Sequence, residues 1–252
     1  MKWVKDPSGE IRVLRKPQDN HQYVIGVDCS EGVKGGDYTC AQVVDMETLE
    51  QVAMVHGLLQ PYDFAKQLNQ LGRYYNTAII NIEVKNTGWA VQDYMMRLYN
   101  YPRFHPWKGK PDRIQSGKVR LWGWDTNTYS RPLLIESGRR AINKRLLEIH
   151  DAATLMEIKQ FSRADTGIYE AEAGHDDRVL ALLLALRSRE ENYVGRSNRI
   201  ISDINLSEPD SFLGVRTLDT AEPDRLLVRH VHKALQGQLN RAKKASKNWL
   251  NL

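Results

Sequence analysis

The sequence of 252 residues contains only two cysteines, Cys29 and Cys40. Two thiols exclude a fold held together by several disulfides and a zinc site made mainly of cysteine. Long apolar stretches are also missing: the longest, residues 179–186, is much shorter than the roughly 18 apolar residues that cross a membrane. The first residues lack the apolar segment of a signal peptide. We therefore expect a soluble protein with reduced thiols and no membrane contact.

A phosphate-binding loop of the form G-x-x-x-x-G-K-[ST] is absent as well. Residues 32–36 are rich in glycine but do not continue into the required Lys-Ser or Lys-Thr pair. The chain therefore lacks the sequence signature of a P-loop ATPase motor.

Charge is present in abundance but is unevenly distributed. Hydrophobic residues make up 41% of the chain and charged residues 27%, which is typical of a globular protein with a sizeable core. The net charge of +5 is too small to indicate a partner. However, residues 97–145 contain twelve Lys or Arg against three acids, and residues 225–252 contain seven basic residues and no acid.

Hydrophobic periodicity predicts an α/β protein. The expected strands are 23–28, 38–44, 52–56, 78–83 and 146–149, with a hairpin over 161–169, and the expected helices begin near residues 61, 88, 133, 151 and 174. We divide the chain into an N-terminal hairpin or extension (1–20), one α/β domain (21–190) and a C-terminal extension (191–252). The last of these ends in a basic amphipathic helix.

Two of the predicted strands end on an acidic residue, Asp28 and Glu83, and the last apolar helix begins beside Asp176 and Asp177. Any one of these residues alone could be a helix cap or a solvated strand end. Parallel neighbouring strands would bring Asp28 and Glu83 together, and the helix start would add the third carboxylate. Such a cluster suits two Mg²⁺ or Mn²⁺ ions, which prefer oxygen ligands.

Four segments in order resemble the nuclease domain of the phage terminase large subunit, a member of the RNase H-like (RuvC-like) superfamily. They are Gly-Val-Asp-Cys-Ser-Glu-Gly (26–32), Ile-Glu-Val-Lys-Asn-Thr-Gly (82–88), Thr-Asn-Thr-Tyr-Ser-Arg-Pro (126–132) and Gly-His-Asp-Asp-Arg (174–178). The resemblance implies an RNase H-like fold: a central mixed β-sheet, its first three strands antiparallel and the later ones parallel, with helices on both faces. It also implies metal-dependent cleavage of concatemeric viral double-stranded DNA during genome packaging.

By the same resemblance, Asp28, Glu83, Asp176 and Asp177 are the catalytic metal ligands, for two Mg²⁺ or Mn²⁺ ions. The sequence does not say which of Asp176 and Asp177 is the main ligand. Three further residues are candidates for an outer position around the site, although each also has a purely structural alternative: Asp37, Glu172 and His175.

The basic stretch 97–145 follows the second acidic position, so it could flank the site and bind DNA, with little sequence specificity. The candidate DNA-binding residues are Lys85, Lys108, Lys110, Arg113, Lys118, Arg120 and Arg131. A solvated hairpin over packed tryptophans is the alternative for most of them. Family members often carry Asn where this chain has Lys85, so its role is less secure than that of the carboxylates.

In the virus, the expected partners are the ATPase motor, the small terminase and the portal, in the cytoplasm of the infected bacterial host. Because the motor signature is missing, the chain is either an excised domain or a gene product separate from its motor. Two rival functions stay open: a resolvase-like nuclease for branched DNA, and a non-catalytic DNA-binding or assembly module.

Overall fold

The computed structural model describes residues 9–33, 35–85, 87–106, 122–144, 146–163, 169–171 and 175–193. Its strands are β1 (Ile11–Val13), β2 (Tyr23–Asp28), β3 (Thr39–Asp45), β4 (Gln51–Gly57), β5 (Ile79–Ile82), β6 (Phe161–Arg163) and β7 (Tyr169–Ala171). Its helices are α1 (Pro61–Tyr74), α2 (Gly88–Arg97), α3 (Arg131–Asn143), α4 (Ala152–Gln160) and α5 (Asp177–Asn192).

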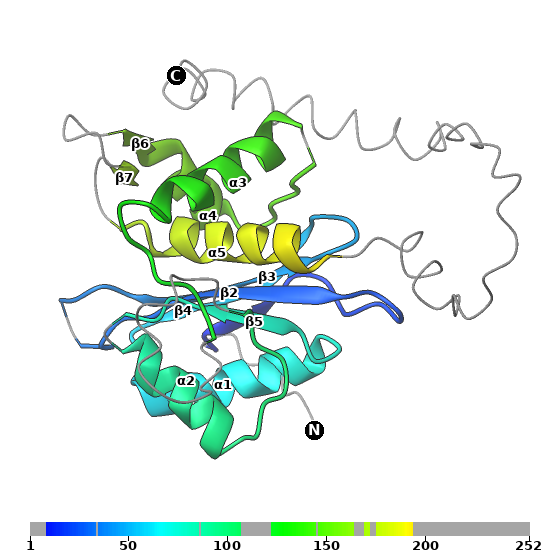
Figure 1. The fold of residues 1–252 in the computed structure, drawn as a ribbon, viewed down its shortest axis with the longest axis vertical. Coiled ribbons are helices and arrows are strands. Elements are labelled where there is room, and N and C mark those ends of the chain that lie inside the picture. Colours follow the sequence, from blue (N-terminus) through cyan, green and yellow to red (C-terminus); the bar gives the residue numbers. More distant parts are fainter. Residues whose placement is uncertain are drawn as a thin grey trace, which may run out of the picture. The chain divides into compact units, whose positions relative to one another are not determined.

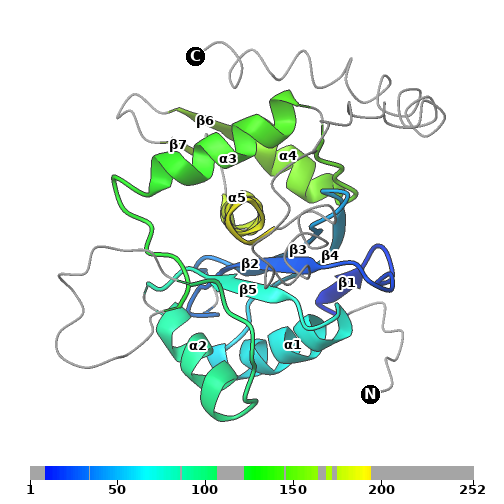
Figure 2. The same ribbon diagram turned by 45° about the vertical axis from the view of Figure 1, so that its right-hand side comes forward.

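The central sheet has five strands in the order β1-β4-β3-β2-β5. Strands β1 to β4 pair in antiparallel fashion, whereas β5 runs parallel to β2. Helices α1 and α2 cover one face of this sheet and α5 covers the other, with α3 and α4 beyond α5 (Figures 1 and 2). The predicted mixed sheet with helices on both faces is confirmed.

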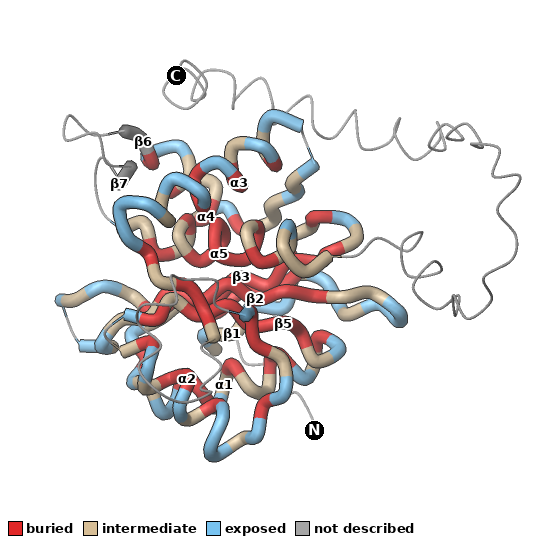
Figure 3. Tube along the Cα trace, in the orientation of Figure 1, coloured by how far each residue is buried: buried red, intermediate tan, exposed pale blue. Residues whose placement is uncertain are grey.

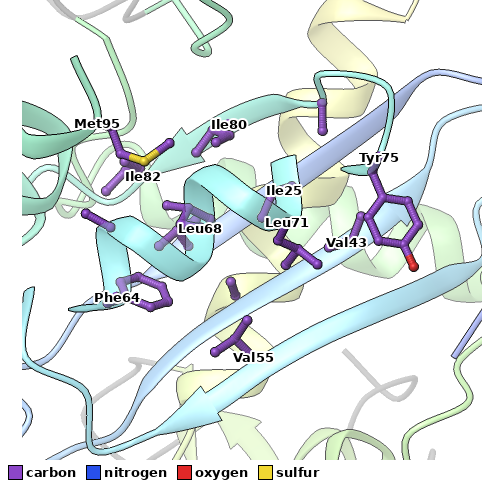
Figure 4. Packing of buried hydrophobic residues seen from close by; sticks show 14 of the residues in the cluster. Ile25, Val43, Val55, Phe64, Leu68, Leu71, Tyr75, Ile80, Ile82 and Met95 are labelled. Atoms are coloured by element: carbon purple, nitrogen blue, oxygen red, sulfur yellow. The ribbon is translucent and has the colours of Figure 1, made fainter. Parts of the chain in front are cut away.

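The face of the sheet toward α1 and α2 is apolar. Because side chains alternate along a strand, Ile25 of β2 and Val43 of β3 point to this face. Phe64, Leu68 and Leu71 recur at helical spacing on α1 and pack against it (Figure 4). All five side chains are fully buried, so this layer forms the main hydrophobic core.

The opposite face, toward α5, carries several polar side chains. Buried Asn81 of β5 donates from Nδ2 to the Leu184 carbonyl of α5 at 2.9 Å, and buried Gln42 of β3 donates from Nε2 to the Arg178 carbonyl at 3.4 Å. Apolar contacts such as Val24 with Leu182 flank these bonds. Helix α5 is buried along most of its length (Figure 3), so the sheet holds it by hydrogen bonds as well as by packing.

Helix α5 lies unusually close to β2. A Cβ atom added to Gly26 would lie 2.0 Å from the Ala181 carbonyl oxygen and 2.3 Å from the Ala185 nitrogen. Both are backbone atoms of a buried helix, so neither can move aside as the end of a flexible side chain would. Glycine at position 26 therefore sets how near the helix comes to the sheet.

Most of the predicted elements are present within a few residues of their expected bounds. The last helix begins at Asp177 rather than near residue 174. The strand predicted at 146–149 is reduced to a single bridge between Glu148 and Glu50. Within the described residues, no helix is both long and apolar enough to cross a membrane.

The proposed division into 1–20, 21–190 and 191–252 stays a prediction. Strand β1 lies inside the first of these segments and pairs with β4. The other half of the predicted N-terminal hairpin and nearly all of the C-terminal extension lie outside the described residues.

We expect Gly26→Ala to destabilise the protein by at least about 2–3 kcal/mol, because the new methyl group would force α5 away from β2. Urea unfolding of the purified variant measures this change. Gly36→Ala is the matched control: its Cβ would lie 3.2 Å from the Val33 side chain and 3.4 Å from the Val33 carbonyl oxygen, and we expect a change within about 0.5 kcal/mol. Equal stabilities for the two variants would show that the contact between α5 and β2 does not require glycine at position 26.

Candidate metal centre

The site begins at the neighbouring ends of β2 and β5. The Glu83 N–H, just past β5, donates to the Val27 carbonyl at 3.0 Å, which places Glu83 beside Asp28. The two side chains point to the α5 face, and the proximity of Glu83 raises the pKa of Asp28. On its other side, Glu83 bridges to Trp124. The predicted meeting of the two carboxylates at one edge of the sheet is therefore seen in the structure.

The chain is tightly folded just after Glu83. A Cβ on Gly88, the first residue of α2, would lie 1.9 Å from the Glu83 carbonyl oxygen. Only glycine allows the helix to begin this close to the strand, so the backbone at Glu83 is fixed from two sides.

Helix α5 supplies the remaining two acidic residues. Asp177 is its first residue and is buried, and its Oδ2 accepts a hydrogen bond from the Tyr38 N–H at 3.3 Å. Asp176, just before the helix, is partly exposed and lies 3.5 Å from the Arg131 guanidinium. Asp177 thus faces the buried part of the site, while Asp176 is held at its edge.

The cluster concentrates negative charge in a buried place. Burial raises the pKa of Asp28 well above its usual range, and the charges of Glu83 and Asp177 raise that pKa further. Burial also raises the pKa of Asp177 to about 6, although the Tyr38 N–H and His175 act against this rise. Lys85 lies 3.9 Å from Glu83 and His175 lies 3.8 Å from Asp177, so part of this charge is countered at the rim. The carboxylate oxygens are the ligands that Mg²⁺ and Mn²⁺ prefer. The residues present therefore fit a divalent metal site.

Asp37 and His175 lie at the rim of this cluster. His175 Nδ1 lies 3.3 Å from Asp37 Oδ1 and 3.8 Å from Asp177 Oδ2. One ligand atom from each of these three residues lies within 4.8 Å of the others, so they could also hold an ion. Two of the three predicted outer residues, Asp37 and His175, therefore lie beside Asp177.

The candidate DNA-binding residues divide into two groups. Lys85 lies 3.9 Å from Glu83 and Arg131 lies 3.5 Å from Asp176, so both reach the site. The others, and Glu172, lie outside the described residues: Lys108, Lys110, Arg113, Lys118 and Arg120.

Comparison with known proteins agrees with this geometry. A family model described as a terminase RNaseH-like domain matches residues 25–189, about two thirds of the chain. This chain belongs to that family.

Solved structures of low sequence identity share the fold of this terminase domain. The large terminase nuclease of thermophilic phage G20c, with bound magnesium, is 20% identical with a TM-score of 0.56, over 72% of this chain and 88% of that one. The same nuclease has been solved with cobalt. The large terminase nuclease domain of Thermus phage P74-26 is also 20% identical, with a TM-score of 0.53, over 71% of this chain and 86% of that one. The RNase H-like fold expected from the motifs is confirmed.

The terminase domain also contains a polar network beside Asp177 that the motifs did not indicate. Arg178 pairs with Glu157 of α4, and its Nη2 donates to His56 Nδ1 of β4 at 3.0 Å. The His56 ring stacks on Tyr38, with ring centroids 4.6 Å apart. Arg178 belongs to the Gly-His-Asp-Asp-Arg motif (174–178), but the sequence did not indicate a role for it. Glu157 is a single acidic residue in a short predicted helix, and such a residue gives no signal by itself.

We expect Asp28→Asn to stabilise the metal-free protein by about 1 kcal/mol, because it removes a buried charge that Glu83 and Asp177 repel. The measurement is urea unfolding at pH 8 with EDTA. Asp19→Asn, in the exposed turn before β2, is the control and should leave the stability unchanged. A destabilised Asp28→Asn protein would show that the carboxylates do not repel one another.

Burial and the neighbouring Arg178 lower the pKa of His56 from 6.5 to about 4. Between pH 6.5 and 4, His56 is protonated in the unfolded chain but stays neutral in the folded protein. This residue therefore lowers the unfolding free energy as the pH falls through that range. We expect the unfolding free energy of the wild type, relative to His56→Gln, to drop by about 1–2 kcal/mol from pH 7 to 4.5, because solvent screens the half-buried ring. If the unfolding free energies of the wild type and His56→Gln changed with pH in the same way, the lowered pKa of His56 would be refuted.

Proposed function

We propose that this chain is a metal-dependent endonuclease that cleaves concatemeric viral double-stranded DNA during genome packaging. One observation carries the proposal. Buried Asp28 lies beside Glu83 and Asp177, and burial together with the charges of these two residues raises the pKa of Asp28 well above its usual range. A cluster of this kind costs folding free energy, and it occurs here in a chain of the terminase RNaseH-like family.

We assign Asp28, Glu83, Asp177 and Asp176 as the residues that hold two Mg²⁺ or Mn²⁺ ions. When bound, two such ions activate a water molecule and stabilise the leaving oxygen of a phosphodiester. Asp177, which is buried and faces Asp28, is the main ligand of the acidic pair in this proposal. Asp176 lies farther out, beside Arg131.

The remaining residues orient these ligands and the DNA. The Tyr38 N–H contacts one oxygen of Asp177 at 3.3 Å, which leaves the other oxygen for the ion. Asp37 and His175 extend the ligand set toward solvent. Lys85 and Arg131 contribute positive charge where a phosphate backbone would approach the carboxylates. We propose that Lys108, Lys110, Arg113, Lys118 and Arg120 continue this contact without reading bases.

The proposal extends to the surroundings of the protein. The expected partners are the ATPase motor, the small terminase and the portal, and the place of action is the cytoplasm of an infected bacterium. We also retain the division into an N-terminal extension (1–20), the nuclease domain (21–190) and a C-terminal extension (191–252).

We expect Mn²⁺-dependent cleavage of linear duplex DNA by the full chain. Asp28→Asn, Glu83→Gln and Asp177→Asn should each lower the rate more than about a hundredfold, because each removes a direct ligand rather than an outer contact. Gel analysis of cut DNA over time measures the rate. Asp19→Asn serves as the control and should cut like the wild type.

The same assay tests the rival functions. A strong preference for four-way junctions over linear duplex would favour the resolvase-like nuclease. DNA binding without any cleavage, in wild type and variants alike, would favour the non-catalytic module and refute the nuclease.

A further inference from the structure

Helix α5 is capped by a residue from another helix. Asp176 occupies its N-cap position, and within the described part of the chain its side chain makes no capping hydrogen bond. Instead, Glu157 Oε2 of α4 accepts a hydrogen bond from the Arg178 N–H at 3.0 Å, and the Val179 N–H also donates to this carboxylate. Glu157 therefore satisfies free N–H groups in the first turn of α5 and complements the positive end of the helix dipole.

The side chain of Arg178 also binds Glu157, together with neighbouring residues. Its Nη1 donates to Glu157 Oε1, its Nη2 donates to His56, and its Nε lies 3.9 Å from Asp151 Oδ2. The carbonyl of Arg178 accepts a hydrogen bond from Gln42. The backbone and the guanidinium of this one residue are thus bound to α4, β3 and β4.

This anchorage matters because Asp177 is the preceding residue. Asp177 lies near the charge of Asp28, and the charges of Asp37 and Glu157 also act to raise the pKa of Asp177. Its own backbone contact, the Tyr38 N–H at 3.3 Å, is long for a hydrogen bond. The restraint that keeps Asp177 in place must therefore come largely from Arg178 and from the group that holds it.

We propose that Glu157, acting through Arg178, is a positioning residue that sets the Asp177 carboxylate where it can share a divalent ion with Asp28 and Glu83. The hydrogen bonds described for Glu157 go to Arg178 and Val179, and its charge also helps to raise the pKa of Asp177. The inference rests on the proposed function, since it presumes that Asp177 is a ligand. Outer residues that orient metal ligands typically change metal affinity by about 10- to 100-fold when removed.

The test compares Glu157→Gln with the wild-type full chain. Glutamine keeps the size of the side chain and an oxygen for the N–H groups, but it loses the charge that Arg178 binds. Isothermal titration with Mn²⁺ in the absence of DNA gives the affinity directly, and the Mn²⁺ concentration for half-maximal cleavage gives a second value. We expect both to weaken by about 10- to 100-fold.

Glu190→Gln is the matched control. Glu190 lies in the same helix and accepts hydrogen bonds from Arg140 at 2.7 Å and Ser137 at 2.7 Å, so the variant breaks a comparable Arg–Glu pair far along α5 from Asp177. We expect a similar loss in urea stability for both variants but a Mn²⁺ affinity within about twofold of wild type for Glu190→Gln.

These measurements distinguish a failure of the positioning role of Glu157 from a failure of the proposed nuclease function. Unchanged Mn²⁺ affinity in Glu157→Gln, or equal weakening in Glu190→Gln, would overturn the positioning role. A wild-type protein that neither binds Mn²⁺ nor cuts DNA would instead refute the proposed function. Should Glu157→Gln fail to fold, Arg178→Lys is judged by the same criteria, because it keeps the backbone cap and the positive charge.

Discussion

The close contact between α5 and β2 at Gly26 is the constraint on which the rest of the structure depends. Without a side chain at this position, the helix backbone lies directly on the strand, where an added Cβ would be only 2.0 Å from the Ala181 carbonyl oxygen. Asp28 follows Gly26 by one alternation of the same strand, and Asp177 lies one helical turn before Ala181. The spacing between β2 and α5 therefore sets the spacing between the carboxylates of Asp28 and Asp177.

The two faces of the sheet contribute differently to this arrangement. Toward α1 and α2 the sheet packs apolar side chains and supplies most of the hydrophobic stabilisation. Toward α5 it carries Gly26, which allows the close approach, and Gln42 and Asn81, which make defined hydrogen bonds in place of apolar contacts. The stability gained on one face allows the other to hold a group of carboxylates that repel one another.

The fold could be predicted from the sequence because its signals are local. Strand β2 and the spacing of Phe64, Leu68 and Leu71 in α1 follow from hydrophobic periodicity alone. The carboxylates were also accessible, because each stands where a strand ends or a helix begins. The meeting of Asp28 with Glu83 then followed from parallel pairing.

The support around the site could not be predicted in this way. Glu157 and Arg178 are 21 positions apart, and neither is unusual among its sequence neighbours. Their pairing depends on how α4 packs against α5, which no local pattern specifies. The strand expected at 146–149 shows the opposite error: a short apolar segment was present, but only Glu148 forms a bridge, with Glu50 just before β4.

The two side-chain hydrogen bonds that the sheet donates to α5 restrict movement of this helix along its own axis. Gln42 and Asn81 bind the carbonyls of Arg178 and Leu184, which lie less than two turns apart along the helix. A shift by one residue would rotate both carbonyls away, and a shift by one full turn would carry Asp177 about 5.4 Å along the axis. The sheet thus specifies an axial register for the helix, much as strand pairing specifies a register within a sheet.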